Sequence, residues 1–190
     1  AACGDIDGDG DLDLYVGNFC DRRPDVYLGR SGPVPNVLLI NEGGRFSKSD
    51  QPELSFEART SGAAFVDLDN DGDLDLYVSN NSKTRGLRVA NKLFENADGR
   101  FREVAGDNDA CVVMGARSIG VLDYDGDGLL DLLVAEDEWT GRRTRLLRNV
   151  GALRFEDVSA KVGLPADIPG LGVITPDLNE DGRPDIFVAE

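Results

Sequence analysis

The chain contains no histidine, and its 190 residues include a single methionine, a single tryptophan and three cysteines. Without histidine it has no Ser-His-Asp or Cys-His catalytic site, no imidazole-ligated zinc site and no histidine pH switch. No apolar run approaches the ~20 residues that a membrane-spanning helix needs, so we expect no membrane insertion. No signal-peptide pattern opens the sequence. It begins abruptly at Ala1 and ends as abruptly at Glu190, and we expect a processed or partial chain.

Basic residues are also few, because 20 Lys and Arg stand against 36 Asp and Glu, which gives a formal net charge of −16. A chain with this charge repels nucleic-acid phosphate and anionic lipid, so we expect neither as a partner. Hydrophobic residues make up 41% of the chain. That fraction is sufficient for a folded core, and the length fits one domain.

Much of the excess acid falls in four segments with the pattern D-x-[DN]-x-D-G-x-x-D, which we call the Asp loops. They start at Asp5, Asp67, Asp123 and Asp177, which are 62, 56 and 54 residues apart. Their spacing indicates an internal repeat. We expect a single domain over residues 1–190 that divides approximately into repeats 1–60, 61–115, 116–171 and 172–190, the last one incomplete.

Each full repeat contains four short runs that are rich in β-branched and aromatic residues and bounded by Gly, Asn and Asp, which predicts β-strands. One run precedes the Asp loop and one follows it. A third recurs at 36–41, 91–96 and 144–149, and a fourth surrounds Phe46, Phe101 and Phe155. Four strands per ~55-residue unit are typical of a β-propeller blade.

We therefore predict an all-β fold, a β-propeller of four-stranded antiparallel blades with about three and a half blades present. Propellers close with roughly four to eight blades, so this is a partial ring. Open blade edges invite association. We expect the rest of a longer chain or another subunit to cover them.

The Asp loops have the composition of Ca²⁺ sites, because Ca²⁺ takes about six to eight oxygen ligands in flexible geometry. Side chains at loop positions 1, 3, 5 and 9 are expected to converge on one ion, position 7 to supply its main-chain carbonyl, and the glycine at position 6 to permit a sharp turn. The predicted ligands, for up to four Ca²⁺ ions, are Asp5, Asp7, Asp9, Asp11, Asp13, Asp67, Asp69, Asp71, Asp73, Asp75, Asp123, Asp125, Asp127, Leu129, Asp131, Asp177, Asn179, Asp181, Arg183 and Asp185.

The loops differ in negative charge, which ranks their expected affinities for Ca²⁺. The fourth loop, with Asn179 and Arg183, offers the least negative charge and should bind most weakly. Mg²⁺ fits less well because it demands octahedral geometry. Solvated turns would explain a single loop, and so would the D-x-D nucleophile loop of phosphatases. Neither explains four loops that carry the same residue types at the same positions. An EF-hand is excluded because position 12 is valine in every loop.

The loops are followed by Leu-Tyr-Val-Gly-Asn at 14–18 and by Leu-Tyr-Val-Ser-Asn at 76–80. In this they resemble the FG-GAP repeats of integrin α-subunit propellers and, more closely, their bacterial VCBS-type relatives. The N-x-L-x-x-N…G-x-F element is similar to repeats of secreted proteins of the cartilage acidic protein type. The Phe-Gly and Gly-Ala-Pro signatures are degenerate here. The resemblance implies a Ca²⁺-stabilised propeller that is extracellular, periplasmic or at the cell surface, and that serves adhesion or recognition.

We thus predict a non-catalytic, Ca²⁺-dependent platform for a protein or an acidic glycan. The propeller portion of a secreted polysaccharide lyase or hydrolase, and a structural subunit of a larger complex, remain alternatives. The acidic-ligand hypothesis rests on three loops on the face opposite the Asp loops, at 17–35, 79–90 and 135–145. They contain Trp139 and nine basic residues, Arg22, Arg23, Arg30, Lys83, Arg85, Arg88, Arg142, Arg143 and Arg145.

The three cysteines give two expectations. Cys3 occupies the strand position equivalent to Phe65 and Val121, so we expect a buried free thiol. Cys20 and Cys111 fall on the same face in different repeats. Whether they form a disulfide bridge, as an oxidising compartment would allow, or remain unbridged is left open. An odd count leaves at least one thiol free or paired to a partner.

Overall fold

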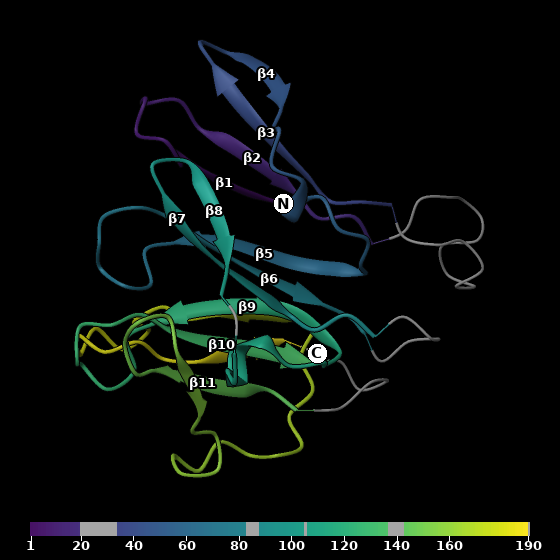
Figure 1. Ribbon diagram of the computed structural model, residues 1–190. Helices are drawn as coiled ribbons and strands as arrows, with labels where there is room; N and C mark the ends of the chain where they lie inside the picture. Colours follow the sequence, from purple (N-terminus) through teal and green to yellow (C-terminus); the bar gives the residue numbers. More distant parts are fainter. Residues whose placement is uncertain (20–33, 83–87, 105, 137–142, 190) are drawn as a thin grey trace.

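The computed structural model describes residues 1–19, 34–82, 88–104, 106–136 and 143–189, and these contain fourteen strands (Figure 1). Blade 1 consists of β1 (Ala2–Gly4), β2 (Asp13–Val16), β3 (Val37–Glu42) and β4 (Arg45–Lys48). Blade 2 consists of β5 (Thr60–Val66), β6 (Asp75–Asn80), β7 (Lys92–Ala97) and β8 (Arg100–Glu103). Blade 3 consists of β9 (Ala116–Leu122), β10 (Asp131–Glu136), β11 (Arg145–Asn149) and β12 (Phe155–Asp157). A half-blade follows, with β13 (Gly172–Ile174) and β14 (Phe187–Ala189).

Each full blade is an antiparallel sheet whose strands pair in chain order, as in β5-β6-β7-β8. The predicted all-β class with four-stranded antiparallel blades is confirmed. Blades 1, 2 and 3 follow one another from the top to the bottom of Figure 1, whereas the half-blade overlaps blade 3 in this view, and within the described ranges the blades do not close into a ring. Short 3₁₀ turns lie in two of the connections between blades, η1 (Pro52–Leu54) and η2 (Asp109–Cys111).

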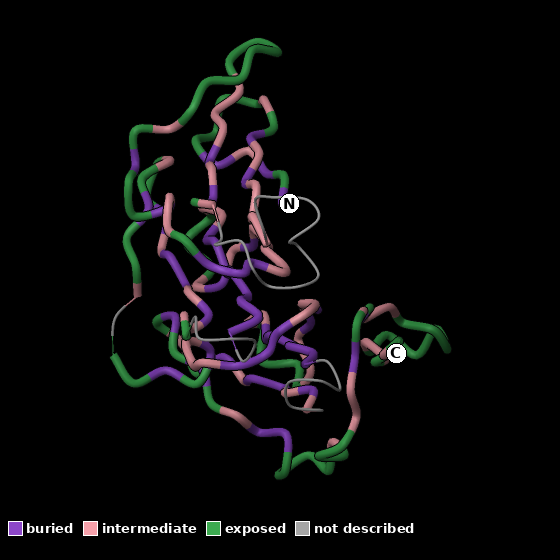
Figure 2. The backbone as a smooth tube through the Cα atoms, turned by 90° about the vertical axis from the view of Figure 1, so that its right-hand side faces the viewer, coloured by how far each residue is buried: buried purple, intermediate pink, exposed green. Residues whose placement is uncertain are grey.

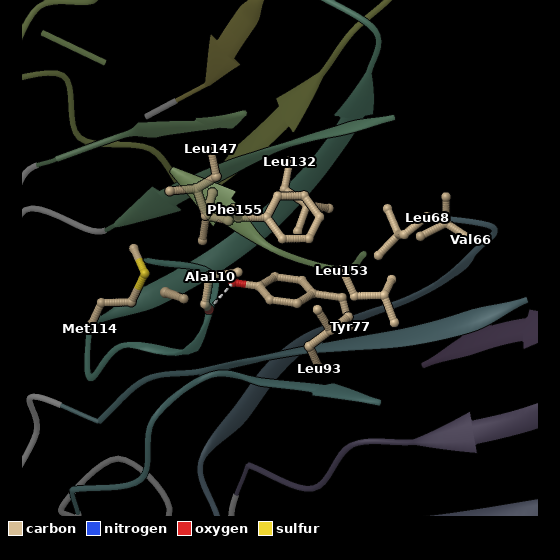
Figure 3. Close-up of a cluster of buried hydrophobic side chains, with 12 residues drawn as sticks. Val66, Leu68, Tyr77, Leu93, Ala110, Met114, Leu132, Leu147, Leu153 and Phe155 are labelled. Carbon is tan, nitrogen blue, oxygen red and sulfur yellow. Dashed lines mark hydrogen bonds between the residues drawn. The ribbon is translucent and has the colours of Figure 1, made fainter. Parts of the chain in front are cut away.

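The hydrophobic core lies between blades, because each sheet buries apolar side chains against the next. In the cluster of Figure 3, Tyr77 and Leu93 of blade 2 meet Leu132 and Leu147 of blade 3. The Tyr77 hydroxyl donates a hydrogen bond to the Ala110 carbonyl at 2.9 Å, so its polar atom is satisfied within the core. Figure 2 shows that buried residues follow the central strands, whereas the C-terminal segment is largely exposed.

Cys3 is exposed, so the prediction of a buried thiol is wrong. Cys3 lies opposite Leu14 in β2, as the equivalent Phe65 lies opposite Leu76 in β6. Phe65 is partly buried because it packs on blade 1. No sheet in the described part of the chain packs on the corresponding face of blade 1. The strand position was assigned correctly, but burial there depends on a neighbouring blade.

Candidate metal centres in the Asp loops

Each Asp loop connects the first and second strands of its sheet, and all four lie along the left-hand side of Figure 1. Their position-6 glycines have positive φ, at 91° for Gly10, 100° for Gly72, 87° for Gly128 and 83° for Gly182. An added Cβ would meet no atom within 4 Å at any of them. Glycine is therefore required for the left-handed backbone conformation and not for space.

The position-1 aspartates hold the loops in shape by accepting main-chain hydrogen bonds. Asp5 Oδ1 accepts from the N–H groups of Gly8 and Asp9, at 2.9 and 3.1 Å, and Asp5 Oδ2 accepts from Gly10 at 3.0 Å. Asp123 and Asp177 also use both oxygens in this way. These bonds draw the loop around one carboxylate and turn the following acids toward it.

The structure brings predicted ligands together in three of the loops. In each group one carboxylate oxygen per residue lies within 4.8 Å of the others. The groups are Asp5, Asp7 and Asp13; Asp67, Asp69 and Asp71; and Asp123, Asp125 and Asp127. Burial, with a contribution from neighbouring aspartates, raises the pKa values of Asp7 and Asp69. Clustering of carboxylates in this way favours a bound cation.

One atom in the second loop tests whether a metal fits. Asp67 Oδ1 is buried and has no hydrogen-bond partner, while Asp67 Oδ2 accepts from Gly72 N–H at 3.2 Å. A buried carboxylate oxygen without a partner is costly. The oxygen belongs to an aspartate that clusters with Asp69 and Asp71. A hard cation with oxygen ligands, such as Ca²⁺, would satisfy it.

The position-9 aspartates have a structural role that the sequence did not reveal. Asp13, Asp75 and Asp131 are almost fully buried. In Asp75, Oδ2 accepts from Leu68 N–H at 3.0 Å and Oδ1 accepts from Asn96 N–H at 3.0 Å. Burial raises the pKa of Asp75 to about 7 and also raises the pKa of Asp131. Of these three aspartates, only Asp13 belongs to one of the three clusters of carboxylates described above.

Position 7 was expected to supply its main-chain carbonyl, yet two of the position-7 side chains also make specific hydrogen bonds. Asp11 Oδ2 accepts from Gly43 N–H at 2.6 Å, in the β3–β4 turn. Asp73 Oδ2 accepts from Asp98 N–H at 3.0 Å, in the β7–β8 turn. These two aspartates therefore tie their loops to a neighbouring hairpin. Leu129 has no polar atom with which to do the same.

The fourth loop is the least acidic. Asn179 Oδ1 and Asp177 Oδ1 both accept from Asp181 N–H, at 2.9 and 3.1 Å. Asp185 Oδ2 accepts from Leu178 N–H at 3.0 Å, as in the other loops. Arg183 lines a cavity of about 480 Å³ between the third and fourth loops, together with Asp123 and Asp125 of the third.

Two asparagines link neighbouring loops across blades. Asn96 Nδ2 donates to the Ile6 carbonyl of blade 1 at 2.9 Å, and Asn149 Nδ2 donates to the Leu68 carbonyl of blade 2 at 2.6 Å. Ile6 and Leu68 occupy position 2 of their Asp loops. The repeated asparagine that ends the third run of each repeat was a visible signal, but its partner lies in another repeat.

Arg148 is a further residue that the sequence analysis missed. Its Nε lies 2.7 Å from Asp125 Oδ2, and its Nη2 donates to Asp127 Oδ2 at 2.9 Å. The Leu129 N–H bond and, after it, the Arg148 guanidinium hold the pKa of Asp127 below its usual value. Arg148 therefore places a positive charge against two predicted metal ligands.

Much of the predicted basic face lies outside the described residues. Arg22, Arg23, Arg30, Lys83, Arg85, Arg142 and Trp139 lie outside the described residues, as does Cys20. Of the remaining basic residues, Arg143 and Arg145 both pair with Asp157, at 3.0 and 3.6 Å. Cys111 is a free thiol. Among the residues that can be placed, no helix has the length and hydropathy needed to cross a membrane.

Comparison with known proteins gives two findings. A family model described as FG-GAP-like repeat matches residues 21–78 and 123–188. Cartilage acidic protein 1 of Xenopus tropicalis is similar, with 32% identity over 145 residues that cover 72% of this chain and 20% of that protein. The Homo sapiens and Mus musculus proteins of the same name are 29% identical over 145 residues. The chain thus spans about a fifth of the length of these curated relatives.

Proposed function

The chain belongs to the FG-GAP-like repeat family, as its Asp loops predicted, and we propose that it is a non-catalytic Ca²⁺-binding repeat protein. The observation that carries this proposal is the carboxylate clustering of the loops, with the unpartnered Asp67 Oδ1 in the second. Asp5, Asp7 and Asp13 would hold the ion in the first loop, and the acids at positions 1, 3 and 5 would hold it in the second and third. A bound Ca²⁺ would supply positive charge that cancels the repulsion among these carboxylates.

Metal binding of this kind would stabilise the fold. Four Ca²⁺ ions, with two charges each, would change the formal charge from −16 to about −8. Affinities typical of extracellular modules correspond to a Kd of roughly 10⁻⁴–10⁻³ M. Similarity to cartilage acidic protein 1 supports a location outside the cytoplasm, where Ca²⁺ at such concentrations is usual.

The wider role that we propose is a platform for adhesion or recognition of a protein or an acidic glycan. The exposed face at Cys3 and the exposed Leu171, Ile174 and Phe187 of the half-blade support further coverage of both ends of the stack. Such coverage would come from more blades of a longer chain or from another subunit. The small share of the relatives' length that the chain spans supports the first of these.

Thermal unfolding with and without Ca²⁺ tests the metal proposal. We expect the melting temperature to rise by roughly 5–15 °C between excess EGTA and millimolar Ca²⁺, because the ion binds the folded loops and not the unfolded chain. The same concentration of Mg²⁺ should give a smaller rise. A variant with Asp69→Asn and Asp71→Asn should lose part of the Ca²⁺ response. A melting temperature indifferent to EGTA at low salt contradicts the proposal.

A further inference from the structure

The residue before the interblade asparagine differs among the blades. Asn41, Asn96 and Asn149 are equivalent, because each donates its main-chain N–H to the position-9 aspartate of its own blade. The preceding residues Ile40, Glu95 and Arg148 are therefore equivalent as well. Glu95 pairs with Arg102 of the neighbouring strand and not with a loop. Arg148 is the basic one of the three, and it contacts the third Asp loop.

Arg148 engages two carboxylates that a metal would need. Asp125 and Asp127 belong, with Asp123, to the group whose oxygens lie within 4.8 Å of one another. The Arg148 side chain is only 33% exposed, and the Asp125 and Asp127 side chains are 24% and 30% exposed. Solvent therefore screens these ion pairs less than it screens the more exposed pair Arg100–Asp50, whose side chains are 68% and 80% exposed.

The third loop also carries less negative charge than the first two. Leu129 takes the place of Asp11 and Asp73, which leaves four carboxylates where the first and second loops have five. Four carboxylates and one guanidinium give a formal charge of −3, against −5 for each of the first two loops. Less negative charge around the site lowers its attraction for Ca²⁺, and a second cation on the same oxygens repels the ion.

We propose that Arg148 is a built-in counter-cation of the third Asp loop. Its single positive charge offsets part of the negative charge of Asp125 and Asp127 while no metal is bound, and it has to leave them when Ca²⁺ binds. The third site is consequently weaker than the first two, and its loop depends less on metal for its shape. The competition rests on the proposed function, whereas the neutralisation does not.

A site-specific probe is available because position 2 of the third loop is Tyr124, where the other loops have Ile6, Leu68 and Leu178. Tb³⁺ that replaces Ca²⁺ in the third loop is sensitised by this tyrosine. The luminescence lost in Tyr124→Phe therefore reports on that loop. The test compares wild type, Arg148→Gln and Arg102→Gln, and the last is a matched control that removes one arginine away from the loops.

We expect the Tb³⁺ concentration for half-saturation of the Tyr124-dependent signal to fall roughly three- to tenfold in Arg148→Gln, as for two partly exposed ion pairs. Arg102→Gln should leave it unchanged. In EGTA, Arg148→Gln should melt at a lower temperature than Arg102→Gln, because repulsion in the loop is no longer relieved.

The outcomes separate the two proposals. Equal half-saturation in wild type and Arg148→Gln, with binding in both, overturns the competition alone. A complete lack of Tb³⁺ and Ca²⁺ binding in all three proteins overturns the proposed function and the competition with it. The melting temperatures in EGTA then decide the counter-cation role by themselves, and equal values for the two variants overturn it.

Discussion

At the scale of single residues, the position-9 aspartates combine a predicted ligand with a structural brace. Each is buried, and in Asp75 and Asp131 both oxygens accept main-chain hydrogen bonds, one from within the loop and one from the third strand of the blade. Buried hydrogen bonds of this kind are costly to break. They fix the end of the Asp loop to the sheet whether or not a metal is present.

Asp75 gives the metal-free protein a pH dependence of known sign. Burial raises its pKa from 3.8 to about 7. Between these values the folded protein holds a proton that the unfolded chain has released, so the free energy of unfolding falls as pH rises from about 4 to about 7. In EGTA, we expect the melting temperature of wild type to fall more steeply over this range than that of Asp75→Asn.

Only the slope in that comparison is diagnostic, because Asp75→Asn also replaces an acceptor with a donor and should lower the melting temperature at every pH. Asp7, Asp69 and Asp131 have raised pKa values too, and they are present in both proteins. Parallel curves for the two proteins would show that Asp75 does not titrate in this range.

The sequence predicted the proximity of loop acids that are close neighbours in the chain, whereas their role as metal ligands stays a prediction. The acids at positions 1, 3 and 5 lie within a few residues of one another, so their spacing alone predicted that they would meet, as in Asp67, Asp69 and Asp71. Arg148 could not be found in this way. It lies 21 residues from Asp127 in the sequence and reaches the loop only because β11 pairs with β10.

At the scale of strands and loops, one asparagine in blade 2 and one in blade 3 join each of these blades to the Asp loop of the preceding blade. Asn96 Nδ2 bonds the Ile6 carbonyl of blade 1 and the Leu74 carbonyl of blade 2, at 2.9 and 3.1 Å. Its main-chain N–H meets Asp75, which in turn accepts from Leu68 N–H. Asn149 repeats the arrangement with Leu68, so hydrogen bonds run without a break across three blades.

We expect Asn96→Ala to lower the free energy of unfolding by about 2–3 kcal/mol, because it leaves the Ile6 and Leu74 carbonyls without this donor in a buried site. Asn41→Ala is the matched control. Asn41 Nδ2 donates to the Leu12 carbonyl of its own blade at 3.1 Å, and Asn41 Oδ1 accepts from Gly44 N–H at 2.9 Å. Both bonds are exposed and lie within one blade, so the loss of this side chain should cost about 1 kcal/mol or less. Urea unfolding measures both, and equal losses would deny Asn96 a special role between blades.

The strands themselves were predictable, whereas the links between them were not. Four short apolar runs in each full repeat predicted four strands, and β5 to β8 follow that pattern. Ile6 and Asn96 are 90 residues apart in the sequence. No local pattern identifies such a pair, and it is visible only once two blades are stacked.

At the scale of the whole molecule, the stack buries the apolar face of each sheet only where another sheet follows. Blade 2 is covered on both sides, and Leu76, Tyr77 and Phe94 are fully buried. Blade 1 and the half-blade each expose one face, marked by Cys3 at one end and by Ile174 and Phe187 at the other. Whether these two end faces are exposed therefore depends on whether another sheet or another chain covers them.

Thiol labelling of the native protein reports on the open end at blade 1. In a Cys20→Ser variant, Cys3 should react with a maleimide much faster than Cys111. Cys3 is exposed, whereas Cys111 is partly buried and burial raises the pKa of its thiol to about 11, so little reactive thiolate forms at neutral pH. Peptide mapping by mass spectrometry separates the two sites, and unfolding in urea should make their rates similar.

Slow labelling of native Cys3 would mean that a second copy of the chain covers this face, and the labelling rate should then rise on dilution. If dilution left Cys3 protected, the open face of blade 1 would be wrong.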